Sequence, residues 1–244
     1  MVIKLTISYD GTNYCGWQVQ PNGVTVQEKI EYALYSLVGE KISVTGSGRT
    51  DSGVHAQGQV ASFVIENGVI PPEKYAPALN RYLPEDIKVI KSEREKDDFN
   101  ARFSAKEKTY VYRTYKSETV LPLLERYAVR INNGVNVDLM KKGAKEIEGE
   151  HDFKCFLASD SSVKSTVRTV YEIRIEEKEN LVEFYVTGNG FLYNMVRIII
   201  GTLLAVGEGK ITPNDVKNII KSGNRSLAGK TLPSKGLTLL SVKY

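Results

Sequence analysis

Residues 41–66 read KISVTGSGRTDSGVHAQGQVASFVIE and place a glycine-rich loop between two strand patterns. The patterns are KISVTG at 41–46 and GQVASFVIE at 58–66, both rich in β-branched residues. The loop between them holds a single carboxylate, Asp51, two residues after Arg49. Its glycines allow the main chain to turn sharply or to approach a ligand closely. Asp51 is therefore a candidate nucleophile, base, metal ligand or turn residue.

The segments on either side of this stretch complete a β-α-β-β-α-β order. Upstream, VIKLTISYD at 2–10 alternates as a strand, and Thr25 with Glu28 forms a capping box that begins a helix ending at Gly39. Downstream, the pattern predicts a helix over 72–83 and a strand over 86–93. This order is that of a ferredoxin-like unit.

The second half of the chain repeats that order. It contains a predicted strand, a helix, a hairpin, two further helices and a closing strand, at 108–116, 137–149, 166–189, about 191–206, 213–222 and 236–244. We expect an α+β fold of two ferredoxin-like halves, 1–104 and 105–244, that share a mostly antiparallel sheet with helices packed on it. The segment 117–136 is expected to be a long surface loop.

Composition favours a soluble cytoplasmic protein. The 244 residues are 41% hydrophobic and 25% charged, and the net charge of +4 permits a polyanionic partner. Two cysteines cannot form a disulfide framework, and the N-terminal stretch has the pattern of a strand rather than of a signal peptide. The most apolar run, 191–207, is too short to span a membrane and contains Arg197.

Neither a metal nor a cofactor is expected. His55, His151, Cys15 and Cys155 are scattered singly, without the spacing of a zinc site. The glycines at 46–53 lack the GK[ST] ending of a phosphate-binding loop, and no G-x-G-x-x-G follows a predicted strand.

The stretch NARFSAKEKTYVYRTYK at 100–116 interleaves cations with aromatic residues. On a strand, one face would carry Lys106, Lys108, Tyr110, Tyr112 and Thr114. Cations for phosphates and rings for base stacking predict a surface for single-stranded or looped RNA, with Lys106 and Lys108 on phosphates. The alternative is a half-exposed sheet face of packing tyrosines and extended lysines.

Arg197 stands among apolar residues in the run 191–207. A guanidinium buried there needs an anionic or multiply accepting partner, and Asp51 is a candidate. The alternative is an arginine whose tip reaches solvent at the edge of a helix.

Several motifs in the same order resemble the tRNA pseudouridine synthase A (TruA) family. GRTDSGVHA at 48–56 resembles the family's G-R-T-D-A-G-V-H-A, with Ser52 in place of alanine, and the stretch at 9–18 matches its Y-D-G-x-x-Y-x-G-W-Q. The similar motifs further along are FNARFSA at 99–105 followed by YVY at 110–112, NGFLYNMVRIIIG at 189–201 and GLTLLSVKY at 236–244.

This resemblance implies a cofactor-free isomerase that converts uridine to pseudouridine at positions 38, 39 and 40 in the anticodon stem-loop of tRNA. It also implies that the protein is a homodimer. It implies that Asp51 is the catalytic nucleophile, Arg49 the nearby arginine, Tyr110 the active-site tyrosine and Arg197 the ion-pair partner of Asp51. The target base is expected to be flipped out. A nearby guanidinium lowers the pKa of a carboxylate by roughly 1–3 units, so Arg197 would keep Asp51 ionised.

Two other functions remain open from the residues. A non-catalytic RNA-binding protein on the same scaffold would not need Asp51 opposite Arg197. A small-molecule enzyme could hold a phosphate at the loop 46–53, but this function would not explain the basic and aromatic stretch.

Overall fold

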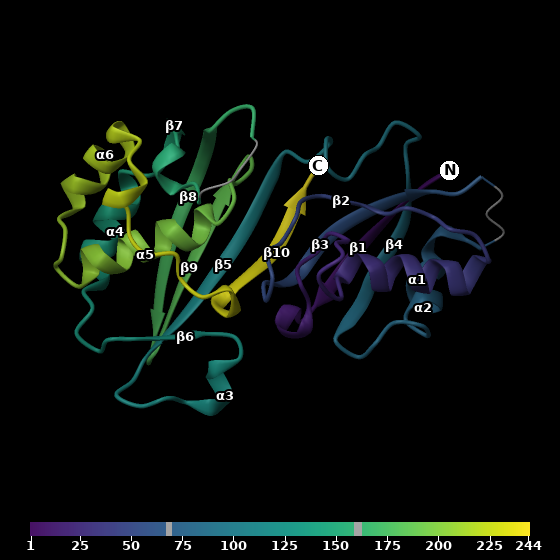
Figure 1. Ribbon diagram of the computed structural model, residues 1–244, viewed down its shortest axis with the longest axis horizontal. Helices are drawn as coiled ribbons and strands as arrows, with labels where there is room; N and C mark the ends of the chain where they lie inside the picture. Colours follow the sequence, from purple (N-terminus) through teal and green to yellow (C-terminus); the bar gives the residue numbers. More distant parts are fainter. Residues whose placement is uncertain (67–69, 159–162) are drawn as a thin grey trace. The chain divides into compact units, whose positions relative to one another are not determined.

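The computed structural model describes residues 1–66, 70–158 and 163–244, which divide into two compact units. The first unit is Met1–Lys106 with Thr238–Tyr244, and the second is Glu107–Leu237. Each unit packs helices against a mostly antiparallel set of strands (Figure 1). The predicted α+β class is confirmed. No helix in the described ranges has the length and apolar character needed to cross a membrane.

The first unit has the β-α-β-β-α-β order in its N-terminal part. Its elements are β1 (Val2–Tyr9), η1 (Gly11–Asn13), α1 (Val26–Val38), β2 (Thr45–Gly46), β3 (His55–Val64), η2 (Pro72–Lys74), α2 (Tyr75–Leu79), β4 (Ile87–Glu95) and the C-terminal β10 (Leu237–Lys243). The central β1 pairs antiparallel with β3 and β4. β2 pairs antiparallel with β3, and β10 pairs parallel with it.

Local sequence explains the best predicted elements of this unit. Burial alternates along β1 in step with its apolar residues, as the strand period requires. α1 begins at the predicted capping box, in which Thr25 and Glu28 satisfy each other's main-chain N–H, and ends at Gly39 with φ +78°. Both predictions are confirmed.

The strand predicted at 41–46 is wrong for most of its length, because only Thr45–Gly46 pairs with β3. Side chains of α1 engage the main chain just before it. Val44 donates its N–H to Glu31 at 3.0 Å, and its carbonyl accepts from the Gln27 amide at 3.1 Å. These bonds occupy groups that a longer strand would have used.

The helix predicted at 72–83 is shorter than expected. A 3₁₀ turn, η2, leads into α2, and α2 ends at Leu79. The next residue, Asn80, exchanges two side-chain hydrogen bonds of 2.8 and 2.9 Å with the main chain of Val89 in β4. The hydrogen bonds of Asn80 to β4 compete with continuation of the helix and end it.

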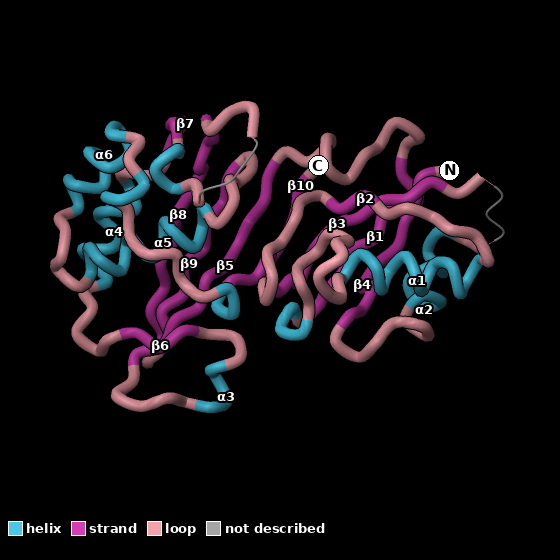
Figure 2. The backbone as a smooth tube through the Cα atoms, in the orientation of Figure 1, coloured by secondary structure: helices cyan, strands magenta, loops and turns pink. Residues whose placement is uncertain are grey.

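The second unit covers one face of its sheet with α4, α5 and α6 (Figure 2). Its strands follow the order β5-β9-β8-β7, all antiparallel, and β6 pairs parallel with β5. The elements are β5 (Glu107–Lys116), α3 (Pro122–Glu125), β6 (Val129–Ile131), α4 (Val137–Lys145), β7 (Gly149–Asp152), η3 (Lys154–Phe156), β8 (Val167–Lys178), β9 (Leu181–Gly188), α5 (Met195–Gly207), α6 (Pro213–Ser222), η4 (Arg225–Leu227) and η5 (Ser234–Gly236).

Two predictions for this unit need correction. The segment 117–136 is not only loop, because it holds α3 and β6; the Tyr115 hydroxyl orders its start by accepting the Leu121 N–H and binding Glu125. The helix predicted to reach 149 ends at Lys145, and Gly149, with φ +109°, begins β7 instead. A residue with this φ cannot continue a helix.

The tyrosine-bearing face of β5 is part of the core. Tyr110, Tyr112 and Thr114 pair with three apolar residues of β9, Val186, Phe184 and Val182. Tyr112 is fully buried and Tyr110 is 8% exposed, as is expected for a sheet face covered by helices. The alternation of side chains along β5 was predicted correctly. The prediction that this face is an open surface for base stacking is wrong.

Candidate active site

The aspartate loop, residues 46–54, connects β2 to β3 in the first unit. Thr50 is buried, whereas the neighbouring Arg49 is exposed and Asp51 is partly exposed. The loop therefore turns its threonine inward and leaves Asp51 partly exposed at its edge.

Thr50 fixes the position of the carboxylate through both its side chain and its main chain. Its hydroxyl is hydrogen-bonded to the hydroxyl of Tyr9 on β1 at 2.8 Å. Its carbonyl accepts the N–H of Trp17 at 3.1 Å. Burial raises the pKa of Tyr9 to about 12, against the opposing effect of hydrogen bonds with Thr50 and Gln59. Tyr9 is therefore a neutral structural anchor at physiological pH.

The beginning of the aspartate loop is tied to β3 by Gln59, which is fully buried. The Ser47 hydroxyl donates to the Gln59 side-chain oxygen at 2.6 Å, and the Gln59 amide donates to the Gly48 carbonyl at 3.0 Å. The buried Gln59 amide would lose free energy of folding if it were left without hydrogen-bond partners. Its bonds to Ser47 and Gly48 are therefore retained, and they restrict the loop.

The end of the aspartate loop is held by one carbonyl, that of Tyr14. It accepts the Gly53 N–H at 3.3 Å and the Ser52 hydroxyl at 3.2 Å. Ser52 is the position at which the chain departs from the TruA motif, and an alanine could not make the second bond. The substitution adds an anchor beside Asp51 without changing the carboxylate.

Gly16 lets the segment after β1 lie directly against the aspartate loop. Its φ is +88°, and a Cβ at this position would lie 2.5 Å from the carbonyl oxygen of Thr50 and 3.2 Å from the carbonyl carbon of Asp51. A side chain would thus be both strained and blocked by main chain. The two glycine-containing motifs recognised in the sequence form one packed structure in the fold.

His55, at the start of β3, has a structural position. It is buried, and its Nδ1 lies 3.0 Å from the Gly11 N–H donor and 3.1 Å from a carboxylate oxygen of Asp10. These contacts hold the end of β1 to the start of β3.

Arg197 lies on α5, which we call the arginine helix, in the second unit. Its side chain is half-buried. Its Nε donates to the Leu232 carbonyl at 2.7 Å, and Nη1 donates to the side-chain oxygen of Asn194. Asn194 caps the helix in the left-handed region, with φ +60°, which asparagine tolerates better than most residues. Two acceptors fix the plane of the guanidinium, and a carboxylate partner would engage its other N–H groups.

The segment 228–233 supplies the Leu232 carbonyl and is itself fixed against the arginine helix. The Gly229 N–H donates to the Thr202 hydroxyl at 2.8 Å, and Arg225 donates to the Gly229 carbonyl at 3.0 Å. A Cβ on Gly229 would lie 2.4 Å from main-chain atoms of the helix, so only glycine fits. The position of Arg197 therefore depends on a segment about 30 residues further along the chain.

Tyr110 lies in the same unit as Arg197. Its ring packs edge-on against Phe191, which precedes the arginine helix, at a centroid distance of 5.4 Å and an interplanar angle of 86°. Its side chain is 8% exposed. Little of Tyr110 is therefore open to solvent, and Phe191 fixes the orientation of its ring.

The predicted phosphate contacts differ in exposure. Lys106 is exposed, and its main-chain N–H donates to the Lys243 carbonyl at 2.9 Å. Lys108 is half-buried on β5, where it pairs with Gly188 of β9. Lys106 is thus the more accessible cation.

The structure brings Arg49 and Asp51 together in the first unit, and it places Tyr110 and Arg197 in the second. The pairing of Asp51 with Arg197 stays a prediction. Sequence reasoning missed three positioning residues, Thr50, Gln59 and Asn194. Thr50 and Asn194 stand within recognised motifs, but their roles depend on partners that sequence spacing does not reveal.

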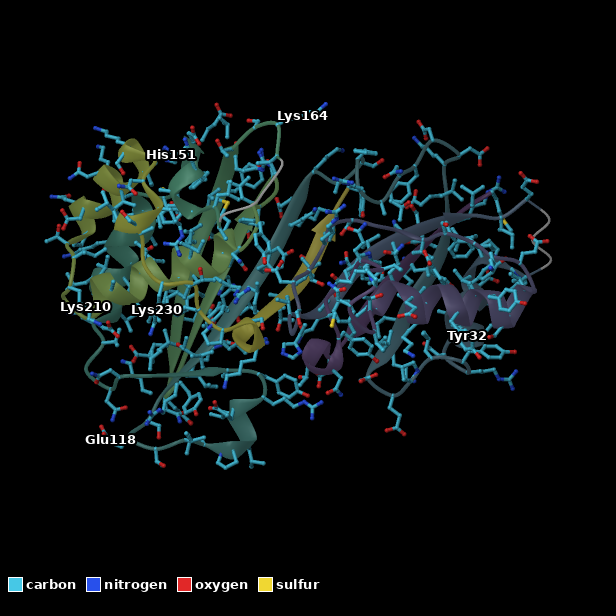
Figure 3. All side chains as sticks on the ribbon, in the orientation of Figure 1. Tyr32, Glu118, His151, Lys164, Lys210 and Lys230 are labelled. Atoms are coloured by element: carbon cyan, nitrogen blue, oxygen red, sulfur yellow. The ribbon has the colours of Figure 1, made fainter. Side chains whose placement is uncertain are left out.

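A cavity of about 640 Å³ in the second unit borders the C-terminal half of the arginine helix and the segment 229–233. Its lining includes Glu118, Lys210 and Lys230 (Figure 3) and, among the described residues, none of the predicted site residues. Lys210 forms an ion pair of 2.6 Å with Glu208, which offsets part of the positive charge of the residues that line the cavity. The predicted residues Arg49 and Asp51 lie on the aspartate loop of the first unit, and Arg197 lies on the arginine helix of the second. No three His, Cys, Asp or Glu side chains of the described chain are arranged to hold a metal ion.

Comparisons with known proteins agree over the length of the chain. A family model described as tRNA pseudouridine synthase matches residues 5–104 and 144–244. The chain is 53% identical over 248 residues to tRNA pseudouridine synthase A of Clostridium acetobutylicum, and 47% identical over 243 residues to that of Acetivibrio thermocellus, in each case across 99% of both chains. A solved structure of an H/ACA RNP bound to a substrate RNA containing 2′-deoxyuridine is 15% identical, with a TM-score of 0.38, across 83% of this chain and 44% of that one.

Proposed function

Because the chain belongs to the tRNA pseudouridine synthase family, it is an isomerase that makes pseudouridine in tRNA, and we propose that it acts on positions 38, 39 and 40 of the anticodon stem-loop with Asp51 as nucleophile. The observation that carries the proposal is the aspartate loop. Bonds to Thr50, Gly48 and Gly53 fix its main chain, while Asp51 stays accessible at its edge. Such fixed placement of a reacting group is a main source of catalytic rate.

The chemistry needs no redox step and no group donor. The bond between ribose C1′ and uracil N1 breaks, the base turns over, and C1′ joins C5. The proton leaves C5, and N1 gains one, so product and substrate are isomers. An ionised carboxylate can form a covalent intermediate or stabilise positive charge that develops on the ribose. Asp51 is the one carboxylate between Gly46 and Gly58.

The other predicted residues support this role of Asp51. Arg197, oriented by Asn194 and the Leu232 carbonyl, would keep the carboxylate ionised. Tyr110 would contact the flipped base and assist proton transfer through its hydroxyl. Arg49, exposed beside Asp51, would bind a phosphate or hold the target nucleotide out of its stack. Extrusion costs a few kcal/mol, and these contacts would offset it.

The direct test of this function is in cells. Sequencing of pseudouridines in tRNA from cells with and without the gene should show loss of the modification at positions 38, 39 and 40 and at no other position. Complementation with the wild-type gene is the control. Unchanged pseudouridine at all three positions would contradict the proposed function.

We also propose that the protein is a homodimer. Doubling a subunit of net charge +4 spreads the positive charge over a larger surface, which suits a long polyanion such as tRNA. One subunit could then hold the tRNA while the other supplies the active site. Light scattering should give twice the chain mass of 27.2 kDa at concentrations at which the enzyme is active. An active monomer would contradict this prediction.

A further inference from the structure

The turn at residues 100–104, which we call the Phe103 turn, presents an aromatic ring to solvent in the first unit. Phe103 is 79% exposed, and the guanidinium of Arg102 lies over its ring, 5.5 Å from the centroid. Arg102 is itself exposed. A cation over an exposed ring is an arrangement that also favours a nucleobase and its phosphate.

The main chain of the Phe103 turn is fixed by its own polar groups. The Asn100 side-chain oxygen accepts the N–H of Arg102 at 2.9 Å and that of Phe103 at 3.2 Å. Asn100 and Ser104 close the turn with two further bonds, of 2.9 and 3.2 Å. The ring is therefore held in water by an ordered turn rather than by a loose loop.

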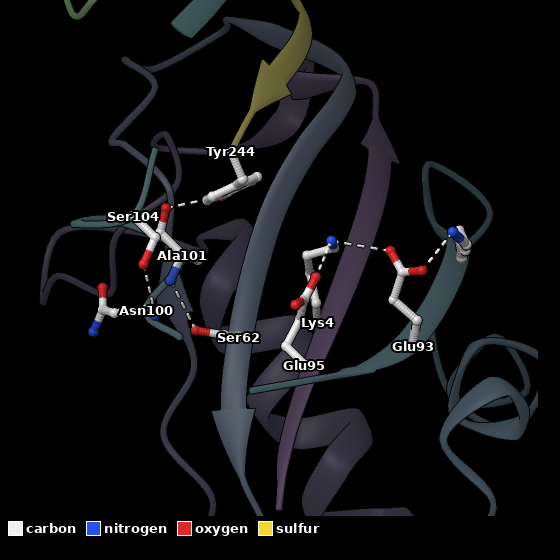
Figure 4. Close-up of polar contacts among 9 residues, drawn as sticks. Lys4, Ser62, Glu93, Glu95, Asn100, Ala101, Ser104 and Tyr244 are labelled. Atoms are coloured by element: carbon white, nitrogen blue, oxygen red, sulfur yellow. Dashed lines mark hydrogen bonds and ion pairs between the residues drawn. The ribbon is translucent and has the colours of Figure 1, made fainter. Parts of the chain in front are cut away.

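The Phe103 turn is also anchored to the body of the first unit through Ala101, which is fully buried. The N–H of Ala101 donates to the Ser62 hydroxyl on β3 at 3.1 Å, and its carbonyl accepts the Tyr244 hydroxyl at 2.8 Å (Figure 4). Burial raises the pKa of Tyr244 above its ordinary value, so this hydroxyl stays protonated and donates. The Tyr244 ring packs against Phe99 at 4.8 Å, and Lys4 lies over both rings.

Phe103 differs from the other aromatic residues of the stretch 100–116. Tyr110, Tyr112 and Tyr115, all in the described chain, are at most 8% exposed. The stacking role that the sequence assigned to the whole stretch is therefore available at Phe103 and closed at the three tyrosines. Single exposed apolar residues are common on proteins, but this one combines an ordered turn, a cation over the ring and the exposed Lys106 three residues later.

We propose that the Phe103 turn is a stacking platform for an unpaired base of the tRNA, with Arg102 and Lys106 on the adjoining phosphates. This inference rests on the proposed function for the identity of the RNA. A flat base covers the part of the ring that Arg102 leaves exposed and removes it from water, and the two cations match the phosphate charge. The platform adds a contact outside the aspartate loop that helps to hold the tRNA while the target nucleotide is extruded.

The experiment measures tRNA affinity by fluorescence anisotropy over a series of salt concentrations. Phe103→Ala should weaken binding about five- to hundredfold, and Phe103→Trp should restore it to within about threefold of wild type, because stacking needs a ring and tolerates a larger one. Phe103→Ala should leave the salt slope unchanged, whereas Lys106→Ala should reduce it by about one. Leu123→Ala is the matched control, because Leu123 is 95% exposed on α3 and should not affect affinity.

Two results would overturn the stacking platform. Phe103→Ala that folds and binds tRNA like wild type would show that no base lies on the ring. A change in mass by light scattering in Phe103→Ala, with tRNA affinity per subunit retained, would assign the ring to a contact between protein chains. The assay measures binding, so it is separate from the proposed function: a wild-type protein that binds tRNA through Phe103 but makes no pseudouridine refutes the function and not the platform.

Discussion

Asp51→Asn should fold, bind tRNA with nearly wild-type affinity and form pseudouridine only at the background rate. The amide keeps the size of the side chain but removes the charge and the nucleophile. The loss should be on the order of 10⁴-fold or more, as for other enzymes that lose a nucleophile. The main-chain bond from the Val54 N–H to the Asp51 carbonyl, 3.1 Å long, does not depend on the side chain, so the loop should keep its shape. Release of tritium from tRNA labelled at C5 of uridine measures the rate.

The matched control for this variant is Ser52→Ala. It removes the neighbouring hydroxyl and its bond to the Tyr14 carbonyl but leaves the carboxylate in place. We expect a decrease in unfolding free energy of about 1 kcal/mol and activity within a few-fold of wild type. Thermal melts of both variants report folding. An Asp51→Asn protein that is folded and keeps more than about a tenth of wild-type activity would refute the nucleophile assignment.

Arg197→Leu should lose activity near neutral pH and recover part of it as the pH rises. Removal of the guanidinium raises the pKa of a carboxylate that was paired with it, so less of Asp51 is ionised at neutral pH and more becomes ionised at higher pH. Leucine suits the apolar arginine helix, so the variant should fold. Rates from pH 6 to 9.5 check the prediction.

Tyr112 does not complicate this pH profile. Burial raises the pKa of its phenol well above the ordinary value, while the charge of Arg197 acts in the opposite direction. Loss of Arg197 raises this pKa further, so Tyr112 stays neutral over the measured range. Arg197→Lys is the control: it keeps a positive charge without the planar donor fork, and it should keep the wild-type pH profile even where the rate falls. A flat profile in Arg197→Leu would show that Arg197 acts on structure and not on the ionisation of Asp51.

The elements that the sequence predicted well are those specified by local pattern. β1 and β5 follow from alternation of apolar residues, α1 from the capping box at Thr25, and the β8–β9 hairpin from the strands on either side of Glu179. α6, predicted at 213–222, begins at Pro213, where Thr212 and Asp215 form a capping box in the structure. In each case neighbouring residues supply the hydrogen bonds and the periodicity.

The elements predicted poorly depend on distant partners. β2 is short because α1 side chains engage Val44, and α2 ends early because Asn80 binds β4. β6 forms because β5 offers it an edge, which a local pattern of three residues does not reveal. Long-range competition of this kind overrides local propensity.

The same distinction applies to the candidate site. Asp51, Arg49 and Arg197 could be selected from motifs, because charge in a glycine-rich loop or in an apolar helix is visible in the sequence. The residues that hold them in position could not be selected from the sequence. The Tyr9–Thr50 hydrogen bond joins residues 41 positions apart, and the Arg197–Leu232 hydrogen bond joins residues 35 positions apart. Only the fold brings these partners together.

Catalysis by Asp51 at the anticodon stem-loop is tested most sharply by mapping pseudouridine in a defined tRNA transcript with uridines at positions 38, 39 and 40. The transcript is incubated with purified wild-type protein or with Asp51→Asn and is analysed by mass spectrometry after chemical labelling of pseudouridine. We predict modification at those positions with wild type, without added metal or cofactor, and none above background with Asp51→Asn. Equal modification by the two proteins, or modification confined to other regions of the tRNA, would contradict the account.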